Sequence, residues 1–154
     1  MIEAWRLVKA SYVASAFDGE GARRYGGRFN NVGTAVVYAA ESLALAQLEI
    51  LVNLPTEQLL ATYAAFRLRF DEALIEVWPV DELPANWRDN PAPQSTKNIG
   101  DRWVQVAQSL VLAVPSAVVP AESNFLINPN HPDFSRLELT GPMDPQMDPR
   151  LFKP

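Results

Sequence analysis

Glycine and proline, the two residues that interrupt regular secondary structure, are distributed unevenly along this chain of 154 residues. Five of the seven glycines lie between Gly19 and Gly33, whereas twelve of the thirteen prolines lie from Pro79 onward. Glycine permits backbone conformations and close approaches that other residues do not, and proline fixes φ and removes an N–H donor. We therefore expect a flexible loop in the first half and short extended segments, separated by rigid turns, in the second.

Hydrophobic patterns between these breaks predict short strands mixed with a few helices. Alternating or β-branched apolar runs favour strands at 5–8, 34–40, 64–70, 75–80, 111–114, 117–119, 124–127 and 134–139, with a long loop at 17–33. Helical spacing favours helices at 43–53, with Ser42 as N-cap and Pro55 as stop signal, and at 99–109. Because strands and helices do not alternate regularly, the expected fold class is α+β with small mixed or antiparallel sheets.

Length and composition bound the domain organisation and exclude several classes of site. We expect one domain at 1–140, followed by a Pro-rich segment at 141–154 with little regular structure. The chain has no Cys, which excludes disulfide scaffolds, zinc fingers and cysteine nucleophiles, and a lone His is a poor basis for a metal site. The net charge of −5 argues against direct binding to nucleic acid. Neither a secretory signal nor a membrane span is visible, so a cytoplasmic location is expected.

Glu49 is unusual because it shares one face of its predicted helix with apolar residues. Leu45, Leu48 and Val52 lie three or four positions from it, so the carboxylate falls on the stripe expected to face the core. A buried carboxylate without a partner costs several kcal/mol, about what a lost buried ion pair costs, and must be compensated. Two interpretations stay open: a structural ion pair or helix-edge position, and a catalytic or ligand-binding carboxylate in a cleft.

The glycine-rich stretch that runs into the strand at 34–40 contains the second candidate, Arg28. Two glycines before an arginine let the backbone approach a ligand, and a guanidinium offers a planar set of donors to phosphate or carboxylate. The stretch matches neither a Walker loop nor a dinucleotide-binding turn, since a strand follows it. A glycine-rich turn with a solvated arginine is the alternative. Tyr38, on the strand itself, fits either a core tyrosine or a ligand platform.

Ser116 lies at a proline break between two apolar runs and is the third candidate. A serine nucleophile needs a base, and the only histidine, His131, lies in a turn-like context between prolines. A Ser-His-acid triad is possible by residue count, but the G-x-S-x-G elbow is absent.

Taken in order, several of these pieces resemble the RES domain family. The resemblance rests on Trp5-Arg6, Gly27-Arg28-Phe29-Asn30, Val37-Tyr38-Ala39-Ala40 with Ser42 and Glu49, Gly100-Asp101 with Trp103, Val114-Pro115-Ser116, and Asn124 with Asn128-Pro129 and His131-Pro132. It covers about residues 4–140. RES proteins are toxins of bacterial toxin–antitoxin pairs, commonly paired with an antitoxin that has an Xre-like helix-turn-helix region. Their fold is similar to that of ADP-ribosyltransferases.

The resemblance implies a site and a substrate. Glu49, Arg28 and Tyr38 match the family's central active-site residues, and Arg6, Ser116 and Asn124 are implied as substrate-binding residues. The implied substrate is NAD, without a metal, cleaved at the nicotinamide–ribose bond by hydrolysis or phosphorolysis. The implied partner is the Xre-like antitoxin, in an oligomeric complex.

Two other functions remain open. The chain could transfer ADP-ribose to a protein, or act only as a binding module of a DNA-binding complex, with Arg28 and Glu49 as an ion pair. A ribonuclease is disfavoured because one histidine and an acidic balance supply neither the usual acid/base pair nor a phosphate-tracking face.

Overall fold

The computed structural model of the chain describes residues 1–54 and 62–152. Its strands are β1 (Ile2–Lys9), β2 (Val37–Ala40), β3 (Tyr63–Phe70), β4 (Ile75–Val77), β5 (Val111–Pro115), β6 (Ser123–Ile127) and β7 (Glu138–Met143). Its α-helices are α1 (Glu20–Tyr25), α2 (Leu43–Asn53) and α3 (Gln94–Val106). Short 3-10 helices are η1 (Ala10–Ser15), η3 (Glu72–Leu74), η4 (Val80–Glu82), η5 (Pro132–Arg136) and η6 (Pro149–Phe152). The expected α+β class is confirmed.

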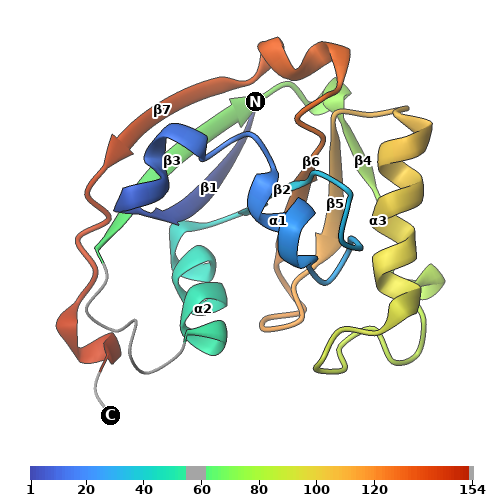
Figure 1. Cartoon of the computed structure of the whole chain (residues 1–154), viewed down its shortest axis with the longest axis horizontal. Helices are drawn as coiled ribbons and strands as arrows, with labels where there is room; N and C mark the ends of the chain where they lie inside the picture. Colours follow the sequence, from blue (N-terminus) through green and yellow to red (C-terminus); the bar gives the residue numbers. More distant parts are fainter. Residues whose placement is uncertain (55–61, 153–154) are drawn as a thin grey trace.

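The strands form one 7-stranded sheet in the order β4-β5-β6-β2-β1-β3-β7 (Figure 1). Neighbouring strands are antiparallel except for β4 and β5, which are parallel, so the sheet is mixed. Strands β1 and β2 pair only through Trp5 and Ala40, whereas β2 pairs with β6 along its whole length. The small separate sheets expected from the sequence are therefore two groups of strands joined at this narrow junction.

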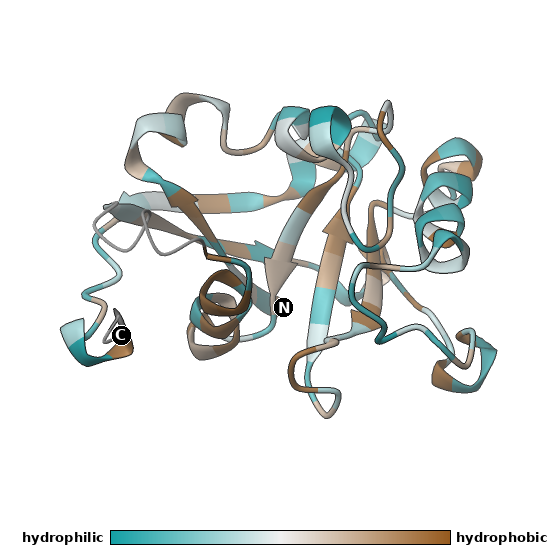
Figure 2. Cartoon of the chain, turned by 60° about the horizontal axis from the view of Figure 1, so that its bottom comes forward, coloured by the Kyte–Doolittle hydropathy of each residue, from teal (hydrophilic) through white to brown (hydrophobic). Residues whose placement is uncertain are grey.

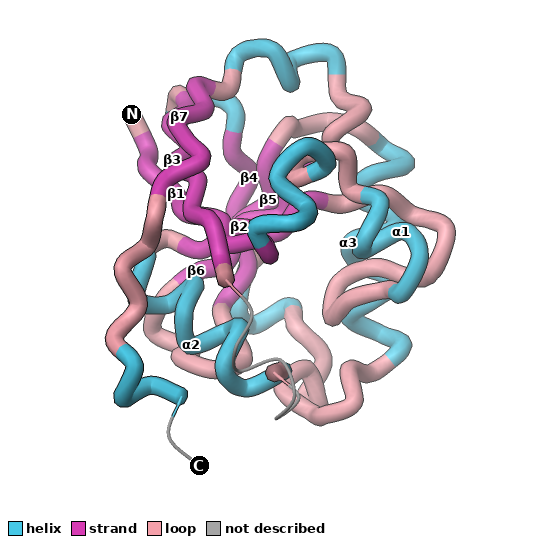
Figure 3. Tube along the Cα trace, turned by 60° about the vertical axis from the view of Figure 1, so that its left-hand side comes forward, coloured by secondary structure: helices cyan, strands magenta, loops and turns pink. Residues whose placement is uncertain are grey.

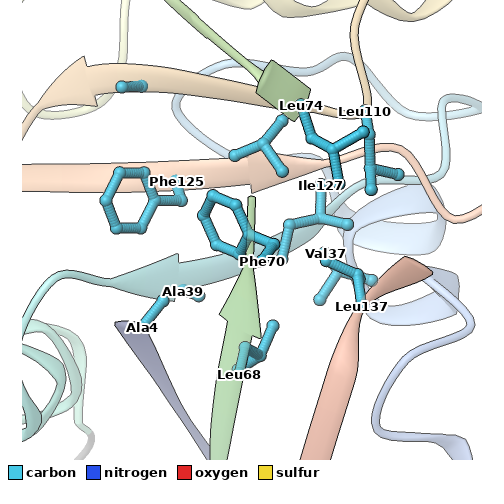
Figure 4. Close-up of a cluster of buried hydrophobic side chains, with 12 residues drawn as sticks. Ala4, Val37, Ala39, Leu68, Phe70, Leu74, Leu110, Phe125, Ile127 and Leu137 are labelled. Carbon is cyan, nitrogen blue, oxygen red and sulfur yellow. The ribbon is translucent and has the colours of Figure 1, made fainter. Parts of the chain in front are cut away.

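Apolar side chains pack on both faces of the sheet. On one face, a cluster drawn in Figure 4 includes Leu68, Phe70 and Phe125, with the two phenylalanine rings edge to face at 5.8 Å. On the other face, Trp103 of α3 packs with Phe29 and with apolar residues of β5 and β6. Helix α2, which is largely hydrophobic (Figure 2), packs on the same face over Ala40 and Trp5. We call this second face, covered by α2 and α3, the helix face.

Several expected elements are confirmed, among them α2 with its cap. The Ser42 hydroxyl accepts a hydrogen bond from the Leu45 N–H at 3.0 Å. The stop signal expected at Pro55 lies outside the described residues. Strand β4 ends at Val77 and lies at one edge of the sheet, as expected for a strand followed by Pro79.

Other elements differ from expectation for identifiable reasons. The loop at 17–33 contains α1, and α3 begins at Gln94 because its polar first turn carries no apolar periodicity. No strand forms at 117–119, because the Ser116 hydroxyl accepts the N–H groups of Val118 and Val119 and turns the chain. Within 141–154, where little regular structure was expected, β7 continues to Met143 against β3 and the short helix η6 follows at Pro149–Phe152.

Candidate active site

The helix face is the face on which most of the candidate residues meet. Directly paired residues of antiparallel strands project to the same side, and Asn124 of β6 pairs with Ala40 of β2, which pairs with Trp5 of β1. Because α2 packs on Ala40 and Trp5, its Glu49 lies on the side from which Asn124 projects. Tyr38 is two residues from Ala40 on β2 and projects to the same side.

Glu49 is held by hydrogen bonds from two residues of the β5–β6 region. Its Oε1 accepts from Ser116 Oγ at 2.6 Å and from Asn124 Nδ2 at 2.8 Å. The apolar stripe expected around Glu49 is only partly correct, because Leu45 is fully buried while Leu48 and Val52 are 40% and 60% exposed. Helix α2 makes its contact through Leu45 and Ala46, so half-buried Glu49 lies at the edge of the packed stripe. Among the described residues, the carboxylate is compensated by hydrogen bonds from neutral donors, and no cation lies within 4.0 Å of it.

The contacts of Ser116 define what its hydroxyl can do. Its Oγ accepts the N–H groups of Val118 and Val119, each at 3.0 Å, and donates its proton to Glu49. A hydroxyl has one proton and two lone pairs, so all of its hydrogen-bonding capacity is used. Ser116 is buried and orients the carboxylate. Ser116 pairs with Glu49 rather than with His131, and its expected contact with a substrate stays a prediction.

Asn124 and Glu49 each keep one oxygen without a partner in the described part of the chain. The Asn124 Oδ1 is buried and unpaired, while its amide nitrogen is directed to Glu49. This orientation of the amide is dictated by chemistry, because an ionised carboxylate only accepts hydrogen bonds. No contact within residues 1–54 and 62–152 engages Glu49 Oε2. The cluster therefore leaves Glu49 Oε2 as an acceptor for a bound molecule, while the buried Asn124 Oδ1 stays without a partner among the described residues.

Tyr38 is fixed to the glycine-rich loop by its hydroxyl. The phenol donates to Asn30 Oδ1 at 2.7 Å and accepts from the Phe29 N–H at 3.1 Å. Burial raises the pKa of the Tyr38 phenol, so the phenol stays protonated at neutral pH. A Cβ at Gly27 would lie 2.8 Å from the Tyr38 hydroxyl, which explains why a glycine stands there. Fully buried Asn30, whose side chain also binds three backbone carbonyls, was not singled out from the sequence.

Arg28 is attached to the segment that precedes α3. Its Nη1 donates to the carbonyls of Trp87 and Asp89 at 2.9 and 2.8 Å, and its own carbonyl accepts from Thr96. The neighbouring Phe29 packs in the cluster on the helix face, so Arg28 and Glu49 belong to the same side of the sheet. Arg28 does not pair with Glu49, and no carboxylate of the described residues lies within 4.0 Å of its guanidinium.

In the described part of the chain, Arg6 meets the other candidate residues only at the backbone of Tyr38. It pairs with Phe66 across β1 and β3 and therefore projects from the face opposite to the helix face. Its guanidinium donates to the backbone carbonyls of Ala16 and Tyr38 at 2.7 and 2.8 Å. Burial lowers the pKa of Arg6 to about 10, which still leaves it charged at neutral pH. Arg6 thus ties the end of η1 to β2 through backbone carbonyls, and its expected contact with a substrate stays a prediction.

His131 has a structural role in the described chain. Its Nδ1 accepts the Asp133 N–H at 3.0 Å, and its Nε2 lies 3.0 Å from the Ala107 carbonyl at the end of α3. Within residues 1–54 and 62–152 no group of three or more His, Cys, Asp or Glu side chains is placed to hold a metal. In the same residues, no helix combines the length and the apolar character needed to cross a bilayer.

Comparisons with known proteins agree with this architecture. The family model of the RES domain matches residues 3–148. Toxin Res of Yersinia enterocolitica is 40% identical over 148 residues, covering 96% of this chain and 97% of that protein. The Prs ADP-ribosylating toxin of a Sphingobium species is 38% identical over 154 residues, covering 97% and 96%. A solved structure, the MbcT–MbcA toxin–antitoxin complex of M. tuberculosis, shares the fold at a TM-score of 0.76 and 19% identity, covering 97% of this chain and 86% of that chain.

The chain thus has a single mixed sheet flanked by helices (Figure 3), the fold that it shares with the toxin of the MbcT–MbcA complex. The chain belongs to the RES domain family. Within that family it is a toxin, like the relatives that match it over nearly their whole length. The family match extends to residue 148, beyond the boundary at 140 expected from the sequence.

Proposed function

We propose that this toxin cleaves the bond between nicotinamide and ribose in NAD. The observation that carries the proposal is the Glu49 carboxylate, whose Oε1 is held by Ser116 and Asn124 while Oε2 has no partner in the described chain. Cleavage of a glycosidic bond develops positive, oxocarbenium-like charge on the sugar. A carboxylate oriented before the reaction stabilises that charge, because little reorganisation is then needed.

The proposed reaction needs few groups from the protein. The bond between the ribose C1′ and the nicotinamide nitrogen breaks, and its electron pair stays on the nitrogen, so nicotinamide leaves as a neutral molecule. Water or inorganic phosphate then forms the new bond at C1′, and water releases a proton on attack. No strong general acid is required, which fits a cluster with one carboxylate. Tyr38 would pack against the nicotinamide ribose, and the Arg28 cation would bind the pyrophosphate.

We further propose that the toxin is held in an oligomeric complex by an antitoxin with an Xre-like helix-turn-helix region, in the cytoplasm, where NAD is available. Support comes from the resemblance noted in the sequence and from the fold neighbour, which was solved with its antitoxin. Co-expression of the toxin with a candidate antitoxin should restore growth and yield a complex on size-exclusion chromatography.

Transfer of ADP-ribose to a protein is the second candidate. It is favoured by the name of the Sphingobium relative, which describes an ADP-ribosylating toxin. Incubation of the toxin with NAD labelled in the adenosine part and with cell lysate separates the two activities. Free ADP-ribose or its phosphate supports NAD degradation, whereas label retained on a protein supports transfer.

The decisive variant is Glu49→Gln, which keeps an acceptor oxygen for Ser116 and Asn124 but replaces Oε2 with a neutral amide. Expression of the wild type should arrest bacterial growth and deplete NAD, and Glu49→Gln should do neither while remaining folded by circular dichroism. Glu3→Gln, which changes an exposed carboxylate on β1, serves as the matched control and should behave as the wild type. Growth arrest by the wild type with unchanged NAD would exclude NAD cleavage.

A further inference from the structure

A second arginine, which no sequence motif singled out, is hydrogen-bonded to the turn that follows Ser116. Arg88 belongs to the connection that precedes α3, and its Nε donates to the Ala117 carbonyl at 3.1 Å. Ala117 follows Ser116 directly, so Arg88 is anchored on the same turn, residues 116–119, that orients Glu49. Arg88 is exposed, and this hydrogen bond holds its Nε next to the residue that follows Ser116.

Arg28 is attached to the two residues that flank Arg88. Its Nη1 contacts the carbonyl of Trp87 at 2.9 Å and that of Asp89 at 2.8 Å. The Arg28 guanidinium thus contacts the short segment that carries Arg88, and each of the two arginines donates N–H groups to backbone carbonyls. In the described residues, Arg28 Nε and Nη2 and both terminal nitrogens of Arg88 make no hydrogen bond. Each arginine is oriented but keeps donors available.

Neither arginine is neutralised by a carboxylate of the described chain. Ion pairs within 4.0 Å engage Arg23, Arg24, Arg69, Arg136 and Arg150, but not Arg28 or Arg88. The side chain of Asp89, which is adjacent in sequence, pairs with neither of the two. Two neighbouring cations without an internal counter-ion, on a chain of net charge −5, form a local site for an anion.

We infer that Arg88 and Arg28 together bind phosphate oxygens beside Glu49, an inference that rests on the proposed function of the same site. A guanidinium presents a planar fork of N–H donors that matches two phosphate oxygens, and two such forks match a dianion or a pyrophosphate. Two molecules of the proposed reaction carry this chemistry: the pyrophosphate of NAD and inorganic phosphate acting as the acceptor. Arg88 is thus a binding residue that the family resemblance did not identify.

Binding of inorganic pyrophosphate, measured by isothermal titration calorimetry on the purified chain, tests the site without NAD cleavage. Arg88→Ala should weaken binding about tenfold or more, as expected for loss of a charge-assisted hydrogen bond. Arg88→Lys, which keeps the charge but not the fork, should recover part of the affinity. Arg102→Ala, which removes an exposed positive charge from α3, is the matched control and should bind as the wild type.

Kinetics then separate the two sources of phosphate. If Arg88 binds the dinucleotide, Arg88→Ala raises KM for NAD in phosphate-free buffer; if it binds the acceptor, only the dependence of the rate on inorganic phosphate weakens. Absence of pyrophosphate binding by the wild type, or equal binding by the wild type and Arg88→Ala, would overturn the inference. Binding that depends on Arg88 in a protein that leaves NAD intact would instead retain the anion site and reject NAD cleavage.

Discussion

The Ser116 hydroxyl makes three hydrogen bonds, and their directions decide what it contributes to Glu49. Because two backbone N–H groups occupy its lone pairs, its proton can be directed only outward, toward the carboxylate. The N–H groups of Val118 and Val119 thus fix the direction of a hydrogen bond to Glu49. Ser116 is a positioning residue, and its effect on a substrate passes through the carboxylate.

Loss of this hydroxyl should therefore lower kcat more than it changes KM for NAD. Ser116→Ala is expected to reduce kcat about 10- to 100-fold, the effect of removing one hydrogen bond to a charged group. Ser116→Thr keeps a hydroxyl and should recover part of the rate, while the exposed Ser135→Ala should have no effect. Steady-state kinetics that show a rise in KM alone would contradict the positioning role.

The buried phenol of Tyr38 should make the free energy of unfolding depend on pH. Burial raises the pKa of its phenol above the ordinary value of 10.0, so the folded state holds the proton after the unfolded state has released it. The free energy of unfolding should consequently fall as pH rises above about 10. Tyr38→Phe should make this fall shallower in urea titrations at pH 9 to 11, roughly the range in which an unfolded tyrosine titrates.

Tyr25→Phe, at a position that is 83% exposed, is the control and should keep the slope of the wild type. Arg6, whose pKa is lowered by burial to about 10, acts with the opposite sign but is common to both variants. Identical slopes for Tyr38→Phe and the wild type would show that the phenol ionises equally in both states.

At the scale of elements, the glycine-rich loop and α3 are joined through Gly100. A Cβ at this position would lie 1.6 Å from the Phe29 carbonyl oxygen, so the helix and the loop that carries Arg28 approach each other backbone to backbone. The Asp101 carboxylate extends the contact by accepting the N–H and the side-chain amide of Asn31. Arg28 is thereby placed by a helix that lies far from it in sequence.

Substitution of this glycine should affect both stability and binding. Gly100→Ala is expected to destabilise the fold by about 3 kcal/mol, the upper part of the range for overpacking, and to weaken pyrophosphate binding because the Phe29 backbone must move. Gly21→Ala in α1 is the matched control: its Cβ meets no atom within 4 Å, so the change should be neutral or stabilising. Chemical denaturation and calorimetry measure both effects.

Elements with local sequence signals are predictable, whereas contacts between distant segments are not. Strands with clear alternation and the capped helix α2 were predicted because their signals are local. The strand expected at 117–119 does not form, because one hydroxyl accepts hydrogen bonds that turn an apolar run. Residues 141–143 join β7 through pairing with β3, a contact between distant segments that local patterns do not encode. Glu49 was found from its position on a helix, but its partners lie 67 and 75 residues away, a distance that local patterns do not encode.

At the scale of the whole molecule, the sheet depends on β7 to cover the edge of β3. Strand β7 pairs with β3 from Glu138 to Met143, so a chain ending at Leu137 exposes the hydrogen-bonding groups of β3. We expect that truncation to aggregate or to unfold at a much lower denaturant concentration. A chain ending at Met143 keeps the pairing and should remain folded, with its unfolding midpoint close to that of the full chain.

The hydrogen bonds that orient Glu49 can form only after Ser116 and Asn124 have been synthesised. A nascent chain that has not reached residue 116 carries the acidic group on its helix but neither donor that directs it. The same is true of a fragment left by premature termination or by proteolysis in the middle of the chain. The orientation of Glu49 is complete only once Asn124 has been synthesised, so a product that ends before residue 116 has an acidic side chain on α2 without either of its two side-chain donors.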